Sequence, residues 1–291
     1  MEDNKKITNE KYHENVVKTW SHGAYSKYQG SSWRWADLPF RDNIIKGDYS
    51  FKEYLNQTLS LKLKEKRILE VGSAMGSAYE FIKNSGLIDL KNYTGIEVSK
   101  VGIDYCKQNH PEANWMHQDF TKLEKLDECD YAFERNAIHH MPDPNKQYDK
   151  ILKSTKIAFS TCFRSCLKGS TISDLTLSNF ITPTGTYYSS IINLFDLIEM
   201  GIQHGFGNIK VTFGGPHEII SNDPKATHYI DPSINQKEIF LSRCKVFMVK
   251  TDFKKQPLIT FVARPDVALK NIKAMILINS ELKKIKKKYA K

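Results

Sequence analysis

The chain has 291 residues, of which 40% are hydrophobic, and a formal net charge of +10 at pH 7. This length suits one α/β core with additions better than two complete domains. No apolar run reaches the length of about 18 residues that predicts a membrane span, and the polar start MEDNKKITNEK does not read as a signal peptide. The five cysteines show no C-x-x-C spacing, so we expect a reduced, cytoplasmic protein without a zinc site or other metal centre.

Most of the positive charge lies at the carboxyl end. Residues 270–291 contain eight lysines and one acidic residue, a net charge of +7, which leaves only +3 for the rest. A nucleic-acid enzyme is expected to spread basic charge around its active face, so this pattern makes a nucleic-acid partner a weaker prediction. We expect residues 266–291 to form a docked helix with a solvated lysine face, and contact with an anionic membrane surface or acidic partner is the alternative. The apolar stripe of this helix is predicted to contain Val267, Ile272, Met275, Ile276, Leu282 and Ile285.

The remaining pattern predicts strands and helices that alternate, as in a doubly wound sheet. Residues 1–66 are expected to be an N-terminal extension with helices over 10–30 and 50–63 and an aromatic-rich segment around Trp33 that caps a site or packs on the core. The core is expected to span 67–265. Its predicted helices are 76–86, 100–109, 144–154 and 192–206. Its predicted strands are 67–71, 93–98, 113–117, 129–134, 157–163, 209–213 and, as an antiparallel last strand, 259–265, with 238–249 as the rival for that place.

The segment RILEVGSAMGSAYEFIK, residues 67–83, is the most informative part of the sequence. A short apolar strand leads into a turn with Gly72 and Gly76, and Glu70 stands two residues before the first glycine. Glycine permits the backbone conformations of such a turn, and the amides at the start of the next helix point at a bound ligand. A carboxylate here would repel a pyrophosphate but suits a cationic ligand. The G-x-G-x-x-G spacing of dinucleotide-binding proteins is absent from this turn.

This turn resembles the first motif of the class I S-adenosylmethionine-dependent methyltransferases, an acidic residue, any residue and then Gly-x-Gly-x-Gly. Ala74 stands at the middle glycine, so the match is incomplete. The resemblance implies a seven-stranded, mostly parallel sheet with an antiparallel last strand, and S-adenosylmethionine as the cofactor. It implies that the cofactor is bound on this turn by Glu70, Gly72, Ser73 and Gly76.

Two further segments match the same family at workable spacing. Glu97 ends the second strand about twenty residues after Gly76, where a carboxylate can accept both ribose hydroxyls of an adenosine; Val98 follows it. In WMHQDF, Asp119 and Phe120 stand where the family contacts the adenine amine and ring. Each residue alone also has an ordinary structural interpretation, Glu97 as a solvated strand end and Asp119 as a common turn residue.

The segment DYAFERNAIHHMPDP, residues 130–144, resembles the fourth strand and following loop of small-molecule methyltransferases. Its strand ends in Glu134, Arg135 and Asn136, at the edge where open α/β sheets bind ligands. The last two are expected to face the methionine part of the cofactor. A histidine with a pKa near neutral is a suitable base for a hydroxyl acceptor, so we predict His140 as the catalytic base, then His139, with Glu134 as a third choice. A purely structural histidine pair is the alternative.

Two insertions, residues 164–190 and 214–257, stand where the family places substrate-recognition elements, and loops of this length are usually functional or disordered. They supply four candidate substrate contacts, Tyr187, Tyr188, His217 and His228, and the aromatic N-terminal segment supplies Trp33. The predicted function is methyl transfer to a small-molecule acceptor, most simply a hydroxyl of a metabolite or sugar, including those of surface glycans. The alternatives are RNA or protein methylation through the basic tail, and a non-catalytic protein that only binds the cofactor. The sequence does not predict an oligomeric state.

Overall fold

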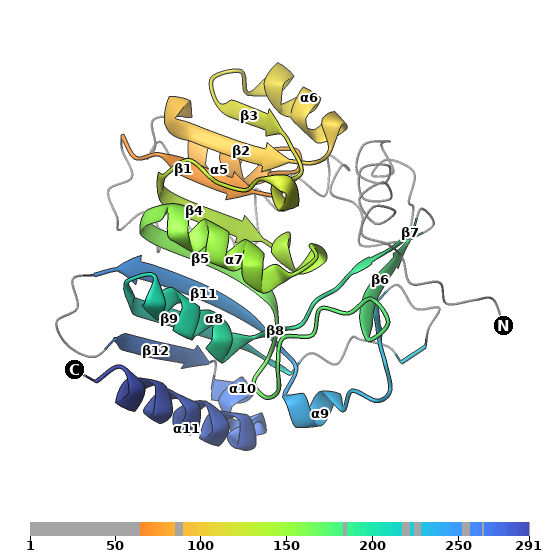
Figure 1. The fold of residues 1–291 in the computed structure, drawn as a ribbon, viewed down its shortest axis with the longest axis vertical. Helices are drawn as coiled ribbons and strands as arrows, with labels where there is room; N and C mark the ends of the chain where they lie inside the picture. The colour runs from red at the N-terminus through yellow and green to blue at the C-terminus, as the bar shows by residue number, and fades with distance from the viewer. Residues whose placement is uncertain are drawn as a thin grey trace.

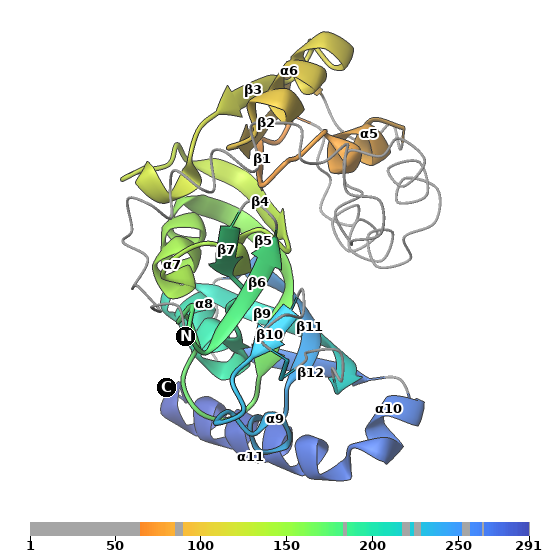
Figure 2. The same cartoon turned by 90° about the vertical axis from the view of Figure 1, so that its right-hand side faces the viewer.

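The computed structural model describes residues 65–84, 90–182, 185–216, 222–223, 228–251, 257–263 and 265–290 (Figure 1). A large mixed sheet forms its centre, and a small antiparallel sheet lies on the side where β4 and β5 end (Figures 1 and 2). The strands are β1 (Ile68–Val71), β2 (Tyr93–Glu97), β3 (Asn114–His117), β4 (Cys129–Arg135), β5 (Thr155–Cys166), β6 (Ser178–Thr182), β7 (Gly185–Tyr188), β8 (Ile192–Asn193), β9 (Phe206–Pro216), β10 (His228–Ile230), β11 (Ser242–Lys250) and β12 (Leu258–Ala263).

The main sheet has the strand order β12-β9-β11-β5-β4-β1-β2-β3, with β8 paired to β5. The five strands from β3 to β5 run parallel to one another. Next to them, β11 is antiparallel to both β5 and β9, while β12 is parallel to β9 at the edge. The small sheet has the order β10-β6-β7. The doubly wound, mostly parallel sheet that the sequence predicted is confirmed.

One strand prediction is wrong. Residues 259–265 were expected to be the antiparallel strand, but β12 in this region is a parallel edge strand. The rival, 238–249, contains β11, which holds the antiparallel place between β5 and β9. This strand lies inside the predicted 214–257 insertion, so that insertion includes part of the core. The pairing partners, which no local pattern reveals, decide between the two strands.

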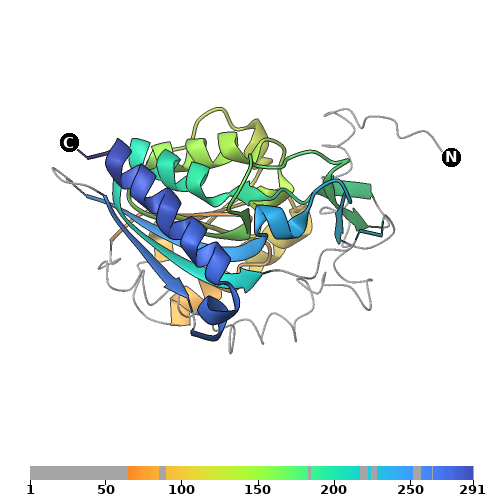
Figure 3. The same ribbon diagram turned by 90° about the horizontal axis from the view of Figure 1, so that it is seen from below.

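The helices cover both faces of the sheet. Helices α7, α8 and α11 pack over one face with Leu69 and Val71, and α5 and α6 pack over the other with Ile68, as Figure 3 shows for the first group. The helices are α5 (Ser77–Asn84), η2 (Leu90–Asn92), α6 (Lys100–Asn109), η3 (Phe120–Lys122), η4 (Ile138–His140), α7 (Pro144–Ser154), α8 (Leu194–Gln203), α9 (Gln236–Ile239), α10 (Pro265–Lys270) and α11 (Ile272–Lys288).

Local capping explains why two helices begin where the sequence predicted. The Ser99 hydroxyl accepts a hydrogen bond of 3.2 Å from the Gly102 amide at the start of α6. At the start of α7, the Asp143 carboxylate accepts one of 3.2 Å from Lys146, and Pro144 occupies the first turn. Side-chain acceptors of this kind satisfy amides that have no partner within the helix.

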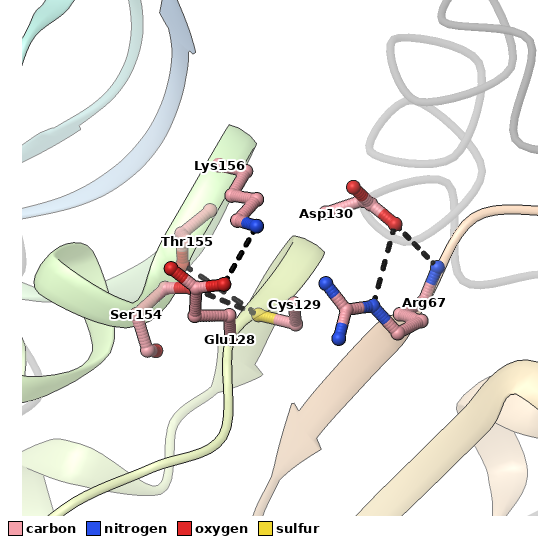
Figure 4. Close-up of polar contacts among 7 residues, drawn as sticks. All are labelled: Arg67, Glu128, Cys129, Asp130, Ser154, Thr155 and Lys156. Carbon is pink, nitrogen blue, oxygen red and sulfur yellow. Dashed lines mark hydrogen bonds and ion pairs between the residues drawn. The ribbon is translucent and has the colours of Figure 1, made fainter.

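Polar contacts close the edge of the sheet at which β1, β4 and β5 begin (Figure 4). The Asp130 carboxylate accepts a hydrogen bond of 2.9 Å from the amide of Arg67, so the start of β4 is joined to the residue just before β1. Lys156 and Glu128 form an ion pair of 2.6 Å beside them. Asp130 thus has a structural role at the edge opposite to the one where ligands bind in such sheets.

The carboxyl-terminal helix is docked, and the predicted stripe is right in part, because Val267, Leu282 and Ile285 are buried. Its buried residues are Ala274, Ile278, Leu282 and Ile285. Ile272 and Ile276 are instead exposed, by 59% and 63%. The apolar residues of α11 extend around more than one face, so the choice of buried face depends on the partner surface. No helix in the described part of the chain is long and apolar enough to cross a membrane.

Candidate functional site

The glycine turn joins β1 to α5 through three residues with left-handed backbone. Gly72, Ala74 and Gly76 have φ values of 76°, 48° and 74°. The amides of Gly72 and Ser73 donate to the Ile96 carbonyl of β2 at 2.9 and 3.2 Å, which holds the turn against the neighbouring strand. A Cβ atom on Gly72 would lie 2.4 Å from that of Ala137, so this position requires glycine both for its conformation and for its space.

Ala74, at the middle position of the motif, has the left-handed backbone conformation that a glycine would permit there. Its amide donates a hydrogen bond of 2.9 Å to the Glu97 carboxylate. Its carbonyl oxygen would lie 2.6 Å from a Cβ on Gly102, so α6 packs closely on the turn. An alanine in the left-handed region costs roughly 1–2 kcal/mol. The substitution therefore leaves the geometry of the motif unchanged at a modest cost in stability.

Glu97 ends β2 with a buried carboxylate. It accepts hydrogen bonds of 2.9 Å from the amides of Ala74 and Ser99. Burial raises its pKa above the usual value, and these backbone hydrogen bonds act in the opposite direction. Each carboxylate oxygen accepts one of these bonds and has a second lone pair, so the group retains acceptor capacity for a ligand hydroxyl. The carbonyl of Val98, the next residue, bonds the His117 ring at 3.1 Å.

Glu70 lies at the end of β1 and is only 4% exposed. The Tyr93 hydroxyl donates a short hydrogen bond to its carboxylate. Burial raises the pKa of Glu70 to about 8, against the opposing effects of Tyr93 and the positive charge of Arg135. At neutral pH this group is therefore largely protonated, and a nearby cation would favour its ionised form.

Asp119 and Phe120 follow β3 in a short helical turn. One Asp119 oxygen accepts hydrogen bonds from the Thr121 amide at 2.9 Å and hydroxyl at 2.7 Å. Phe120 is buried, and the Lys150 ammonium lies 4.1 Å from the centre of its ring. Lys150 also donates to the Phe120 carbonyl at 2.5 Å. This network fixes the turn that the family resemblance assigns to adenine.

Glu134 is fully buried at the end of β4 and holds the loop that follows. Its carboxylate accepts from the amides of Ala137 at 2.9 Å and Ile138 at 3.2 Å. It also accepts from the hydroxyls of Tyr148, at 3.0 Å, and Thr161. With these donors around it, Glu134 is placed to anchor the loop, and this geometry gives no support to its third-choice role as a base.

The left-handed Asn136, with a φ of 55°, turns the chain from β4 into the histidine pair of η4. The two rings lie 4.0 Å apart. His140 Nδ1 is 2.7 Å from the Tyr188 carbonyl oxygen. Burial lowers the pKa of His140 to about 4 and that of His139 well below 6.5, so both rings are neutral at pH 7.

Residues 188–190, at and just after the end of β7, connect the histidine pair to a cluster around Arg164 that was not predicted from the sequence. The carbonyl of Tyr188 binds His140, the Ser189 hydroxyl accepts a hydrogen bond from Arg164, and the Ser190 amide donates to the His139 carbonyl at 2.8 Å. The predicted substrate contacts Tyr187 and Tyr188 thus lie in the strand beside the histidines. Tyr187 itself is 1% exposed.

Arg164 is 5% exposed near the end of β5, and its Nη2 lies 3.4 Å from His228 Nδ1 on β10. The sequence placed Arg164 in an insertion, but β5 continues through it to Cys166. The predicted contacts Trp33 and His217 lie outside the described residues. Within the described ranges, no group of three or more His, Cys, Asp or Glu residues could hold a metal ion.

Comparisons with known proteins agree with this arrangement. Residues 68–156 match a methyltransferase domain. The solved complex of DhpI with S-adenosylhomocysteine shares 13% identity over 84% of this chain and 100% of that chain, with a TM-score of 0.50. No curated protein sequence gives a significant match.

Two further solved structures are similar at lower TM-scores. A magnesium protoporphyrin IX methyltransferase from Synechocystis with bound S-adenosylhomocysteine has 13% identity over 81% of this chain and 98% of that chain, with a TM-score of 0.49. An O-methyltransferase from Brevibacillus brevis, also with S-adenosylhomocysteine, has 15% identity over 77% of this chain and 82% of that chain, with a TM-score of 0.47.

The sheet order, the left-handed turn after β1 and the acidic end of β2 define a Rossmann-like methyltransferase fold. With the domain match over residues 68–156, they show a methyltransferase domain in a fold that is shared with S-adenosylmethionine-dependent methyltransferases. The residues present fit this cofactor, because Glu97 keeps acceptor capacity and the buried Ser73 hydroxyl on the turn has no hydrogen-bond partner among the described residues.

Proposed function

We propose that the protein transfers a methyl group from S-adenosylmethionine to a hydroxyl of a small-molecule acceptor, with His140 as the general base. The observation that carries this proposal is the 2.7 Å contact between His140 Nδ1 and the Tyr188 carbonyl oxygen. A carbonyl only accepts hydrogen bonds, so Nδ1 of the neutral ring carries the proton. The basic nitrogen is then Nε2.

The bound cofactor supplies an activated sulfonium methyl group, so the chain must mainly align the acceptor and exclude water. Nε2 of His140 would take the hydroxyl proton as the acceptor oxygen attacks the methyl carbon. Its lowered pKa keeps the ring neutral at pH 7 and able to accept this proton, but it also makes the ring a weaker base than the near-neutral histidine that the sequence predicted. Glu134 would position the base through its hydrogen bonds to the loop that bears it.

Cofactor contacts are proposed on the turn and strand ends that the family resemblance marks. They are Glu70, Gly72, Ser73, Gly76, Glu97, Val98, Asp119, Phe120, Arg135 and Asn136. We propose Tyr188 as an acceptor contact, because it is partly exposed beside His140, and Tyr187 as its support, because it is buried.

A metabolite or sugar acceptor in the cytoplasm fits the enclosed position of the histidine pair. RNA or protein methylation is the second candidate, and the location of the basic segment disfavours it. Helix α11 packs beside β12, at the far edge of the sheet from β1 and β2 (Figure 1). A protein that binds the cofactor without catalysis is the third candidate.

The test is turnover by a His140→Ala variant, measured as S-adenosylhomocysteine released with a panel of hydroxyl acceptors. We expect a loss of about 10²–10⁴-fold, the usual contribution of a general base, with cofactor affinity in calorimetry near that of the wild type. His139→Ala is the matched control, because its ring lies 4.0 Å away without the carbonyl contact, and it should retain more activity. Unchanged turnover of His140→Ala would show that the ring is structural, and no turnover by the wild type with any acceptor would favour the binding-only candidate.

A further inference from the structure

Arg164 is a buried cation without a carboxylate partner among the described residues. Its side chain is 5% exposed, and its two hydrogen-bond partners, Ser189 and His228, are uncharged when His228 accepts through Nδ1. Its Nε atom has no partner there. Burying an ion without an opposite charge costs several kcal/mol, so natural proteins rarely do so unless the charge has a function.

The neighbouring strand makes this position still less favourable. Arg243 of β11 lies directly opposite Arg164 in the pairing register. Like charges directly opposite each other destabilise a sheet. Arg243 is exposed and also has no ion pair within the described part of the chain. No acidic side chain there neutralises the two arginines. Burial and the charge of Arg243 lower the pKa of Arg164 to about 10, which still leaves it charged at pH 7.

The free part of the guanidinium has the shape of an anion site. Nη1 donates to Ser189. Among the residues that the structure describes, Nε has no partner and Nη2 has one long contact, of 3.4 Å to His228. Nε and Nη2 together form one edge of the planar fork, and such an edge binds two oxygens of a carboxylate or phosphate side by side.

This edge is connected directly to the proposed base. The His140 ring lies 5.6 Å from that of Phe180, which lies 4.5 Å from that of His228. On the other side, consecutive residues of the 188–190 segment hold His140 and Arg164. An anion on Arg164 would therefore be a part of the same molecule that presents its hydroxyl to His140.

We propose that Arg164, with Arg243 beside it, binds an anionic group of the methyl acceptor, a carboxylate or a phosphate. The acceptor is thus an anionic hydroxyl compound, such as an acidic sugar or a phosphorylated metabolite. This inference rests on the proposed function, since it concerns the acceptor of that reaction. It states that the acceptor is negatively charged and that Arg164 and Arg243 select it for this charge.

The experiment uses the full chain saturated with S-adenosylhomocysteine and titrates inorganic phosphate in one arm and acetate in the other, at constant ionic strength. We expect at least one anion to bind in the millimolar range and to raise the unfolding temperature. Arg164→Met should weaken this binding at least tenfold, and Arg243→Gln about threefold. Arg67→Gln, on the opposite edge of the sheet, is the control and should bind like the wild type. The preferred anion distinguishes a carboxylate from a phosphate acceptor.

Two results would overturn the inference: no anion binding by the wild type, or equal binding by wild type, Arg164→Met and Arg243→Gln. In anion-free buffer, Arg164→Met should unfold at the same or a higher temperature, because a ligand-binding cation is a cost in the free protein, whereas a structural arginine predicts a fall. Arg243 is exposed, so its variant remains informative if Arg164→Met fails to fold. The proposed function is tested separately. If the wild type does not bind S-adenosylhomocysteine, the proposed function is refuted whatever the result with the anions.

Discussion

Two groups of buried ionisable side chains lie near the carboxyl ends of the central strands, one of acids and one of bases. The cofactor group consists of carboxylates at the ends of β1, β2 and β4: Glu70, Glu97 and Glu134. The acceptor group consists of bases beside β5 and β7: His139, His140 and Arg164.

The same burial acts on the two groups in opposite directions. It raises the pKa values of the carboxylates and lowers those of the bases. Arg164 keeps its positive charge at pH 7, whereas burial holds Glu70, His139 and His140 largely neutral. Under the proposed function, the acids would form a donor half of the site and the bases an acceptor half, and burial shifts the pKa values of the two halves in opposite directions.

The largest expected effect comes from breaking the cofactor half at Gly72. Gly72→Ala places a Cβ 2.4 Å from that of Ala137 in a left-handed conformation, so the turn must move. We expect S-adenosylhomocysteine affinity, measured by calorimetry, to fall at least 100-fold. Gly169→Ala in the acceptor half is the matched control, because its φ of 77° is similar but no atom lies within 4 Å of the new Cβ. It should cost about 1 kcal/mol of stability and leave cofactor binding intact. Similar losses in both variants would mean that backbone strain, not the contact with Ala137, governs the turn.

The next largest effect is on the free energy of unfolding, which should respond to pH in opposite directions through the two halves. Glu70 has a folded pKa of about 8 against an ordinary value of 4.5, so its contribution to stability is lost as pH rises from 4.5 to 8. His140 has a folded pKa of about 4 against 6.5, so its contribution is complete above pH 6.5 and is lost as pH falls towards 4. Each group can change the free energy of unfolding by up to about 1.4 kcal/mol per pH unit.

Denaturant unfolding of three proteins between pH 4 and 9 measures these slopes. Glu70→Gln should flatten the dependence of the free energy of unfolding on pH only between pH 4.5 and 8. His140→Asn should flatten it only below pH 6.5. If either variant keeps the wild-type slope in its own window, the corresponding group is not held neutral by burial.

The smallest effect is expected at Ala74, where glycine restores the full family motif. Ala74→Gly relieves the left-handed alanine but increases the freedom of the unfolded chain, so the two terms largely cancel and stability should change by less than about 1 kcal/mol. Its amide still reaches Glu97, so cofactor affinity should stay within about twofold of the wild type in calorimetry. A larger gain in affinity would show that the alanine itself weakens the donor half.

The donor half could be predicted from sequence because its signals are local. The strand, turn and helix of 67–83 and the capped helices over 100–109 and 144–154 were found from glycine spacing, apolar period and capping residues. The acceptor half depends on contacts between distant segments. Nothing in the sequence near Arg164 indicates that Arg243 lies opposite it, or that Ser189 and His228 lie beside it. The burial of Arg164 follows from that assembly and could not be predicted.

Under the proposed function and the proposed anion site, the 188–190 segment would measure length along the acceptor. Tyr188 holds the proposed base and Ser189 the proposed anion site, so the two contacts come from adjacent residues. The backbone itself would then set how far the reacting oxygen stands from the negative charge. Relatives that carry one residue more or fewer at this point would select a longer or shorter acceptor while keeping the same chemistry.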